Sequence, residues 1–238
     1  MSAEMAATTF SDLANDRHLL GRASTAELVA DVLRGRIAEG QLPPGTRLAE
    51  EAIGAALAVS RNTLREAFRL LTHERLLVHE LNRGVFVRTL TAQDVTELYR
   101  VRRVVECAAV RRPVAAQAAL ARARESVADG EQAAQDGRWG DVGTANIRFH
   151  QALGSMAGSS RVDEFMHAIL AELRLVFHVM KNPRSFHEPY LSRNRELVTL
   201  LDAGDFEAAE QSLARYLDDA EAQLVEAYAQ VLEQDKRG

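Results

Sequence analysis

Apolar positions follow two different patterns along the 238-residue chain, and the pattern changes near residue 90. Between 25 and 90, segments with helical or strand spacing alternate with turns, whereas from 91 to 238 the spacing is helical throughout. The chain is therefore predicted to be mainly α, with a mixed N-terminal domain and an all-helical C-terminal bundle. Residues 1–24 have weaker periodicity and are expected to form a flexible arm, with a short helix around 10–20.

The first helix of the mixed domain is predicted from a cap at Ser24 or Thr25 to a stop at Gly40. Four apolar residues recur at helical spacing and are expected to face inward: Leu28, Val32, Leu33 and Ile37. The segment Gln41–Gly45 contains two adjacent prolines, so it is predicted to be a turn that no helix can include.

Two short helices with a tight joint come next, at 49–57 and from the N-cap Ser60 to about residue 73. Ala58 and Val59 form the predicted turn between them. The residues expected to face inward are Ile53, Ala56 and Leu57 on the first helix, and Leu64, Ala67, Phe68 and Leu71 on the second. This pair is typical of a helix-turn-helix.

A β-hairpin is predicted after the second short helix, with strands at 76–78 and 85–87. The bend between them is Asn82–Gly84, where glycine supplies the positive φ that hairpins need. The resulting order of helix, helix, turn, helix and hairpin predicts a winged helix-turn-helix over residues 25–90.

Only helices are predicted in the C-terminal domain. Pro113 is expected to break or kink the first of them, and Lys181–Pro189, with two prolines, is expected to be a loop. Ala203–Asp205 joins the last two helices. The predicted helices are 93–127, 130–137, 141–157, 161–180, 191–203 and 205–234.

The second helix of the predicted helix-turn-helix presents a polar face that suits the major groove of DNA. Arginine can pair with guanine O6 and N7, asparagine with adenine N6 and N7, and a helix N-terminus can hold a phosphate. Arg83 at the hairpin tip can reach a phosphate or the minor groove. The predicted DNA-binding residues are Ser60, Arg61, Asn62, Thr63, Arg65, Arg69 and Arg83. The alternatives are an ordinary solvated helix face and, for Arg83, a simple exposed turn residue.

The net charge of −5 argues by itself against a nucleic-acid partner, but the charge is unevenly distributed. Residues 22–90 contain ten Arg against eight Asp and Glu, whereas 91–238 contain eighteen Lys and Arg against twenty-three acids. This difference suggests that the two domains do different work.

Cysteine content and hydropathy predict a cytoplasmic protein with no membrane partner. The only cysteine, Cys107, can form no intrachain disulfide and lies in an apolar helical stretch, where an inert core thiol is expected. No apolar run approaches the roughly 20 residues that span a bilayer. The first residues lack the basic and then apolar order of a secretion signal.

Three motifs in residues 25–90 resemble the GntR family of bacterial regulators: Gly40–Leu48, Val59–Ala67 and Asn82–Val87. The resemblance implies a dimer that binds operator half-sites, with Ser60, Arg61, Thr63 and Arg65 contacting bases or phosphates. Two departures stand out. Asn62–Thr63 replaces the Thr-Pro pair common in the family, and Glu51 stands where the family commonly has an arginine. The acid is expected to repel phosphate, so one backbone contact is lost.

Residues 93–235 are similar to the FCD effector domain of the FadR-like branch of that family. The matching segments are Leu98–Glu106, Asn146–Leu153 and Leu200–Asp205. Such domains typically hold a divalent metal through one Asp and three His. The corresponding residues here are Asn146, His150, Asn194 and Tyr216, so His150 is the only surviving ligand of the family type.

An asparagine amide and a neutral tyrosine are poor ligands for zinc or nickel, so no metal cofactor is expected. A substitute site made by His167, His178 and His187 is the alternative, but nothing in their spacing recommends it.

Arg102 is the residue that the resemblance assigns to binding an acidic effector, and a bidentate arginine suits a carboxylate. The predicted effector-binding residues are Arg102, Asn146, His150, Asn194 and Tyr216. Simpler interpretations remain open for three of them. Arg102 can form an intrahelical salt bridge to Glu106, four residues further on; His150 can be an ordinary core histidine; Tyr216 can serve packing alone.

The leading hypothesis is a transcriptional regulator, expected to be a repressor. It predicts a homodimer on palindromic half-sites, with recognition helices about 34 Å apart. A bound effector would alter the spacing of the two DNA-binding domains. An enzyme is disfavoured because the chain has no nucleophile elbow, phosphate loop, zinc-protease motif or Cys-His arrangement. The remaining alternative is a ligand-independent DNA-binding protein whose helical domain only dimerises.

Overall fold

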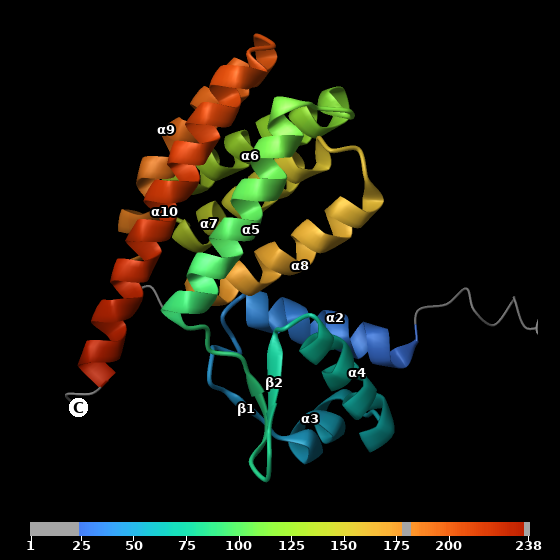
Figure 1. The fold of residues 1–238 in the computed structure, drawn as a ribbon. Helices are drawn as coiled ribbons and strands as arrows, with labels where there is room; N and C mark the ends of the chain where they lie inside the picture. The colour runs from blue at the N-terminus through green and yellow to red at the C-terminus, as the bar shows by residue number, and fades with distance from the viewer. Residues whose placement is uncertain (1–23, 178–181, 236–238) are drawn as a thin grey trace, which may run out of the picture.

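The computed structural model describes residues 24–177 and 182–235 of the chain (Figure 1). The predicted short helix around 10–20 lies outside the described residues. In the lower part of Figure 1 are α2 (Thr25–Ala38), β1 (Arg47–Leu48), α3 (Glu50–Leu57), α4 (Arg61–His73), β2 (Leu77–Glu80) and β3 (Gly84–Val87). In the upper part are α5 (Ala92–Arg111), α6 (Ala116–Gln135), α7 (Trp139–Ser155), α8 (Ser160–Phe177), α9 (Pro183–Asp202) and α10 (Phe206–Asp235). The mainly α fold with one small sheet is as the sequence predicts.

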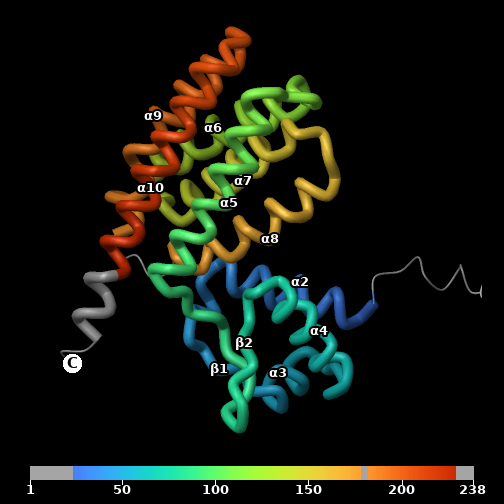
Figure 2. The backbone as a smooth tube through the Cα atoms, in the orientation of Figure 1, coloured from blue at the N-terminus to red at the C-terminus, as the bar shows by residue number. Residues whose placement is uncertain are grey.

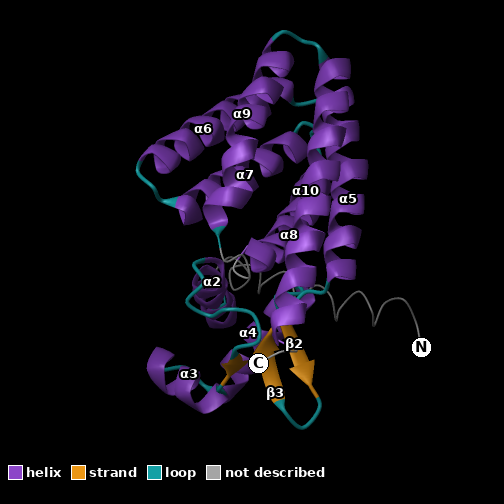
Figure 3. Ribbon diagram, turned by 90° about the vertical axis from the view of Figure 1, so that its left-hand side faces the viewer, coloured by secondary structure: helices purple, strands orange, loops and turns teal. Residues whose placement is uncertain are grey.

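The sheet has the order β1-β3-β2 with antiparallel pairing, and its hairpin projects away from the helical domain (Figure 3). Val78 pairs with Phe86, and Asn82 and Gly84 have φ values of 61° and 107° in the turn. The hairpin is therefore confirmed. The third strand, β1, was not expected, because two residues are too short to show alternation.

The helix-turn-helix is also confirmed. Ala58 adopts the left-handed conformation at φ 52° between α3 and α4, and the Ser60 side chain accepts a hydrogen bond from the Thr63 amide at 3.1 Å. Leu64, Ala67, Phe68 and Leu71 are buried as expected. On α3, Ile53 and Leu57 are half-buried, whereas Ala56 is exposed, against the prediction.

The prediction of which α2 residues face inward was partly wrong. Leu28 and Val32 are 55% and 45% exposed, whereas Leu33 and Ile37 are buried. The buried side of α2 also contains Ala26, Val29 and Ala30. This side packs against α4 and α8, and small alanines let the helices approach closely.

Pro113 separates two helices, α5 and α6, where one helix over 93–127 was expected to be broken or kinked. The break is stabilised because the Val114 and Ala115 amides both donate to the Met156 carbonyl, at 2.8 and 3.1 Å. The predicted separate helix at 130–137 was wrong, since α6 continues through Gly130. At this residue a Cβ would lie 3.3 Å from the Ala145 Cβ, so the glycine permits close packing of α6 on α7.

The prediction of a loop over Lys181–Pro189 was wrong for residues 183–189, which form the first turns of α9. Pro183 occupies the first turn, where a missing N–H costs nothing, and the Asn182 side chain caps the helix by accepting from the Ser185 amide. Pro189 lies inside the helix and leaves the Ser185 carbonyl without its usual donor. The side-chain amide of Gln223 on α10 donates to that carbonyl at 3.4 Å instead.

The helical domain is built around α5, α7, α9 and α10, with α5 and α10 side by side along their length (Figures 1 and 3). Its lowest helix, α8, lies across α2 of the N-terminal domain, as the backbone trace shows (Figure 2). Within the described residues, no helix is long and apolar enough to cross a membrane. Cys107 is buried, and burial raises the pKa of its thiol to about 12, which fits an inert core residue.

Candidate DNA interface and effector core

The N-terminal half of α4 presents the polar face that the sequence predicts. Arg61, Asn62, Arg65 and Arg69 are exposed, and Thr63 is half-buried, with its hydroxyl 2.8 Å from the Ser60 hydroxyl. Arg83 stands exposed at the tip of the hairpin. The structure thus places all seven predicted DNA-binding residues on α4, its cap and the wing.

Three of these arginines lie beside carboxylates. The Arg65 Nε donates to Glu50 Oε2 at 3.1 Å, across the joint between α3 and α4. Arg69 pairs with Glu66 at 3.4 Å within α4, and Arg83 pairs with Glu80 across the hairpin turn. The last two pairs are local, whereas the pair of Arg65 joins two helices.

A groove of about 400 Å³ lies between α4 and the sheet. It is lined by Glu50, Arg65, Phe68, Arg69, Thr72, His79 and Val85. Arg65 and Arg69 give it cationic donors, and His79 of β2 also lines it. A groove of this kind suits a phosphate backbone that passes between recognition helix and wing. Glu51 is exposed at the start of α3.

Three helices bring the predicted effector residues together inside the upper domain. The Asn146 Oδ1 of α7 accepts hydrogen bonds from Asn194 Nδ2 of α9 and from the Tyr216 hydroxyl of α10, both at 2.9 Å. His150 lies one turn beyond Asn146, and its ring meets the Tyr216 ring edge-on at 5.0 Å between centroids. Residues of three helices therefore form one polar cluster, in which Asn146 is half-buried and the other three are buried.

Glu106 connects this cluster to Arg102. One carboxylate oxygen accepts from Arg102 Nε at 2.7 Å, and the other lies 2.6 Å from His150 Nδ1. The side chains of Arg102, Glu106 and His150 are each at most 1% exposed. The intrahelical salt bridge weighed for Arg102 therefore exists, but it is buried and shared with a histidine of another helix.

Burial and charge set the protonation of this group. Burial by itself would raise the pKa of Glu106, but Arg102 and His150 outweigh it, so the pKa of the carboxyl is lowered. Burial lowers the pKa of His150, and the positive charge of Arg102 lowers it further. The set at neutral pH is therefore an ionised Arg102–Glu106 pair beside a neutral imidazole that donates from Nδ1.

Several buried polar atoms of the cluster have no hydrogen-bond partner among the described residues: Arg102 Nη2, His150 Nε2 and Asn194 Oδ1. The Arg102 guanidinium also lies over the Tyr99 ring at 4.7 Å, which keeps it in place. Unpartnered buried donors and acceptors are costly, so a cluster of them in one core indicates a place for a polar ligand or water.

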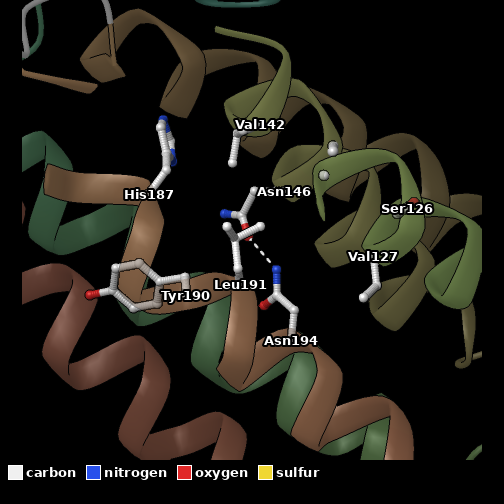
Figure 4. A pocket seen from close by; sticks show the side chains of 10 residues that line it. Ser126, Val127, Val142, Asn146, His187, Tyr190, Leu191 and Asn194 are labelled. Atoms are coloured by element: carbon white, nitrogen blue, oxygen red, sulfur yellow. Dashed lines mark hydrogen bonds between the residues drawn. The ribbon is translucent and has the colours of Figure 1, made fainter. Parts of the chain in front are cut away.

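A narrow cavity of about 10 Å³ adjoins the cluster between α6, α7 and α9 (Figure 4). Asn146 and Asn194 lie on one side of it and His187 on another, with the Tyr190 ring nearby (Figure 4). This space is enough for about one water molecule. An organic ligand of several atoms could occupy this cavity only if the surrounding helices moved apart.

The donor set does not suit a divalent metal. Asn146 Oδ1 is already hydrogen-bonded twice, and burial raises the pKa of Tyr216 well above its ordinary value, so the phenol stays neutral. Of the four side chains, only His150, through the lone pair of Nε2, is a strong metal ligand. No group of three or more His, Cys, Asp and Glu side chains close enough to hold a metal occurs in residues 24–177 and 182–228. Of the alternative histidines, His167 is exposed, His187 is buried near α7, and His178 lies outside the described residues.

Sequence reasoning named Glu106 only as an alternative salt-bridge partner of Arg102, and did not predict its contact with His150. It assigned no role to Glu50, and it named His187 only as part of an alternative metal site. Glu50 precedes Arg65 by fifteen residues and carries no local signal. His187 fell in a segment expected to be a loop.

Comparison with known proteins gives two family matches that together span most of the chain. Residues 25–87 match the gntR family of bacterial regulatory proteins, and residues 97–219 match the FCD domain. The D-xylose utilization operon transcriptional repressor of Paenarthrobacter nicotinovorans, a function given there as probable, is 29% identical over 83% of this chain and 88% of its own length. The gluconate operon repressor of Bacillus subtilis is 39% identical over 40% of this chain and 39% of its own length.

A solved structure described as a GntR transcriptional regulator from Rhodococcus sp. RHA1 is 51% identical, with a TM-score of 0.83. The match covers 87% of this chain and all of that one. The structure of McbR/YncC from E. coli, 23% identical with a TM-score of 0.74, shows the same fold. This chain thus belongs to the GntR family of DNA-binding transcriptional regulators and carries an FCD effector domain.

Proposed function

We propose that the protein is a homodimeric, cytoplasmic repressor that binds a palindromic operator. Its affinity for the operator changes when a small organic acid binds in the FCD domain. The observation that carries the sensor part is the unpartnered Arg102 Nη2, a cationic donor held completely inside the helical domain. We assign the protein no catalytic role.

The DNA-binding part rests on the exposed polar face of α4. Arg61 and Asn62 stand in the first turn, where side chains of a recognition helix reach base edges, and the Ser60 cap leaves helix amides for a phosphate. Two such helices about 34 Å apart would read half-sites one helical turn apart, which requires a dimer.

The effector part rests on the chemistry of the buried cluster. Arg102 Nη2 is available to donate to a carboxylate, and His150 Nε2 and Asn194 Oδ1 can each accept from a ligand hydroxyl. Because Glu106 already balances the charge of Arg102, we expect hydrogen bonds to set specificity as much as net charge. Binding is proposed to need no metal.

The small volume of the cavity beside Asn146 and Asn194, about 10 Å³, supports a mechanism for regulation. An effector that enters this cavity would separate α6, α7 and α9, and α7 packs directly on α8, which lies against α2. Ligand entry would therefore shift α8 and, with it, the spacing of the two DNA-binding domains.

The test has a DNA arm and an effector arm. Sequences selected from random DNA by the full-length protein are expected to be palindromic, and Arg61→Ala should weaken binding to them by about 10-fold or more. Failure to select any common sequence would contradict the regulator.

In the effector arm, small carboxylic acids are screened for an increase in melting temperature. An acid that stabilises the native protein is expected to lose its effect in Arg102→Gln, with Asn194→Ala as a second variant in case Arg102→Gln fails to fold. An acid that stabilises both variants as strongly as the native protein would remove this cluster from the effector site.

A ligand-independent DNA-binding protein is the second candidate, and the small volume beside the cluster favours it. It predicts selective DNA binding with no thermal stabilisation by any acid in the screen.

A further inference from the structure

We infer that Glu50 is a positioning residue that holds Arg65 for reading one base pair, and that it thereby sets part of the operator specificity. This inference rests on the proposed DNA-binding function. Glu50 does not belong to α4, the helix that carries Arg65, but to α3, the other helix of the helix-turn-helix.

The ion pair joins two helices whose relative position is fixed. Glu50 is the first residue of α3, and Arg65 lies in the second turn of α4. The left-handed turn at Ala58 and the half-buried Ile53 and Leu57 hold the two helices together. The carboxylate of Glu50, 35% exposed, is thus a more rigid partner for Arg65 than solvent or a residue of the same helix turn.

The hydrogen bond between Arg65 and Glu50 leaves the two terminal Nη groups of the guanidinium available to DNA. The Arg65 Nε is the atom that donates to Glu50 Oε2, at 3.1 Å. An arginine held at Nε still presents its two terminal Nη groups, which is the edge that donates to guanine O6 and N7 together. Arg65 remains 64% exposed beside the groove, so this edge can meet DNA.

The charge of Glu50 acts in the opposite direction on unrelated DNA. A carboxylate beside Arg65 repels phosphates and offsets part of the positive charge of the arginine, which weakens binding to any sequence. Glu50 is therefore expected to reduce non-specific binding and to sharpen base discrimination at the same time. A residue that supplied charge alone would change the affinity for all sequences by the same factor.

Glu51 provides a matched control. It follows Glu50 directly, has the same charge, and is exposed at the start of α3, but the carboxylate bound to Arg65 is that of Glu50. Neutralising either acid changes the local charge by the same amount. Only the change at Glu50 removes the support for Arg65.

The experiment measures fluorescence anisotropy of the full-length protein with its selected operator, with every single-base variant of one half-site, and with unrelated DNA. Arg65→Ala is expected to lose discrimination at one base pair by about 10-fold or more. Glu50→Ala should lose about 3- to 10-fold at that same base pair while binding unrelated DNA more tightly. Glu50→Gln, whose carbonyl can still accept from Nε, should retain most of the discrimination, and Glu51→Gln all of it. Adding Glu50→Ala to Arg65→Ala should cause no further loss.

The inference is overturned if Glu50→Ala behaves like Glu51→Gln, raising affinity for all sequences equally. It is also overturned if Glu50→Ala alters preference at a base pair that Arg65→Ala does not affect. If Arg65→Ala leaves every base preference intact while Arg61→Ala abolishes selection, Arg65 is not a base reader and the inference falls, but the regulator stands. Loss of selection in the native protein would instead contradict the proposed function itself.

Discussion

Glu172 of α8 accepts a hydrogen bond from Arg88 at 2.8 Å and so joins the effector domain to the segment that follows the wing. The same arginine donates to Asp94 at 2.6 Å, a residue of the capping box that begins α5. Arg75, at the end of α4, lies 3.9 Å from the other Glu172 oxygen. A single carboxylate, only 4% exposed, therefore lies close to one arginine that precedes the β2–β3 hairpin and one that follows it.

Removing Arg88 is expected to destabilise the protein much more than neutralising Glu172. Arg88→Ala leaves a buried carboxylate with only the distant and largely exposed Arg75, at a cost on the order of 3 kcal/mol in the free energy of unfolding. Burial already raises the pKa of Glu172 despite its cations, so Glu172→Gln removes a costly charge and should change stability by less than about 1 kcal/mol. Urea denaturation measures both values.

The double variant is the control for this prediction. Glu172→Gln should recover most of the stability lost in Arg88→Ala, because no buried charge then lacks a partner. If the losses simply add, the two side chains are not energetically coupled.

His187 is expected to make the protein less stable as the pH falls. Burial lowers the pKa of His187 to about 4, with a smaller contribution from Arg174, whereas an unfolded histidine titrates near 6.5. Below pH 6.5 the unfolded chain therefore binds a proton that the folded protein does not. The stability is complete above pH 6.5 and decreases down to about pH 4, by about 3 kcal/mol from this residue.

Denaturation curves between pH 4 and 7.5 test this effect. His187→Gln should flatten the pH dependence of the unfolding free energy, whatever its effect on absolute stability. The exposed His79→Gln should keep the native slope. Equal slopes in all three proteins would show that His187 titrates alike in both states.

The DNA-binding half could be predicted from local signals. Ser60, the turn at Ala58 and the spacing of Leu64 and Phe68 are determined by neighbours within a few residues, and each was found as expected. Which face of α2 is buried depends instead on where α4 and α8 pack against it. This is why the exposed Leu28 and Val32 were misassigned.

Long-range partners account for the errors in the helical half. Pro183 and Pro189 indicated a loop, because Pro189 cannot donate to the Ser185 carbonyl. Gln223, 38 residues after Ser185, donates to that carbonyl instead, and the helix continues. The cluster of Asn146, Asn194 and Tyr216 was located through the family resemblance, which encodes such distant contacts. Glu106 was predicted only as a possible partner of Arg102, because the spacing of the two residues shows neither that the pair is buried nor that His150 shares the carboxylate.

Gly143→Ala is expected to destabilise the protein, because a Cβ at this position of α7 would lie 2.8 Å from His187 Nε2. His187 is buried and packs edge-on against Phe177 and Phe186, so its ring has little room to move away from an added methyl group. The expected loss is about 1–3 kcal/mol in the free energy of unfolding.

Gly140 is the matched control on the same helix. No atom lies within 4 Å of a Cβ there, so Gly140→Ala should be neutral or stabilise by up to about 1 kcal/mol through helix propensity. Thermal denaturation of the two variants gives the comparison. Equal effects would mean that His187 moves aside at no cost.

Restoring the residues typical of the family should create a metal site. His150 already has the orientation of a ligand, since its Nδ1 is held by Glu106 and its Nε2 is buried without a partner. Asn146→Asp, Asn194→His and Tyr216→His together would place one carboxylate and two imidazoles around the point where three hydrogen-bonding groups now meet. The triple variant is expected to bind about one zinc or nickel ion per chain, and adding His150→Ala should abolish that binding. The native protein, purified without chelator, should contain no stoichiometric metal in the same elemental analysis. Native protein that holds a metal through His150 would refute the metal-free effector core, because the amides and the phenol would then be acting as ligands.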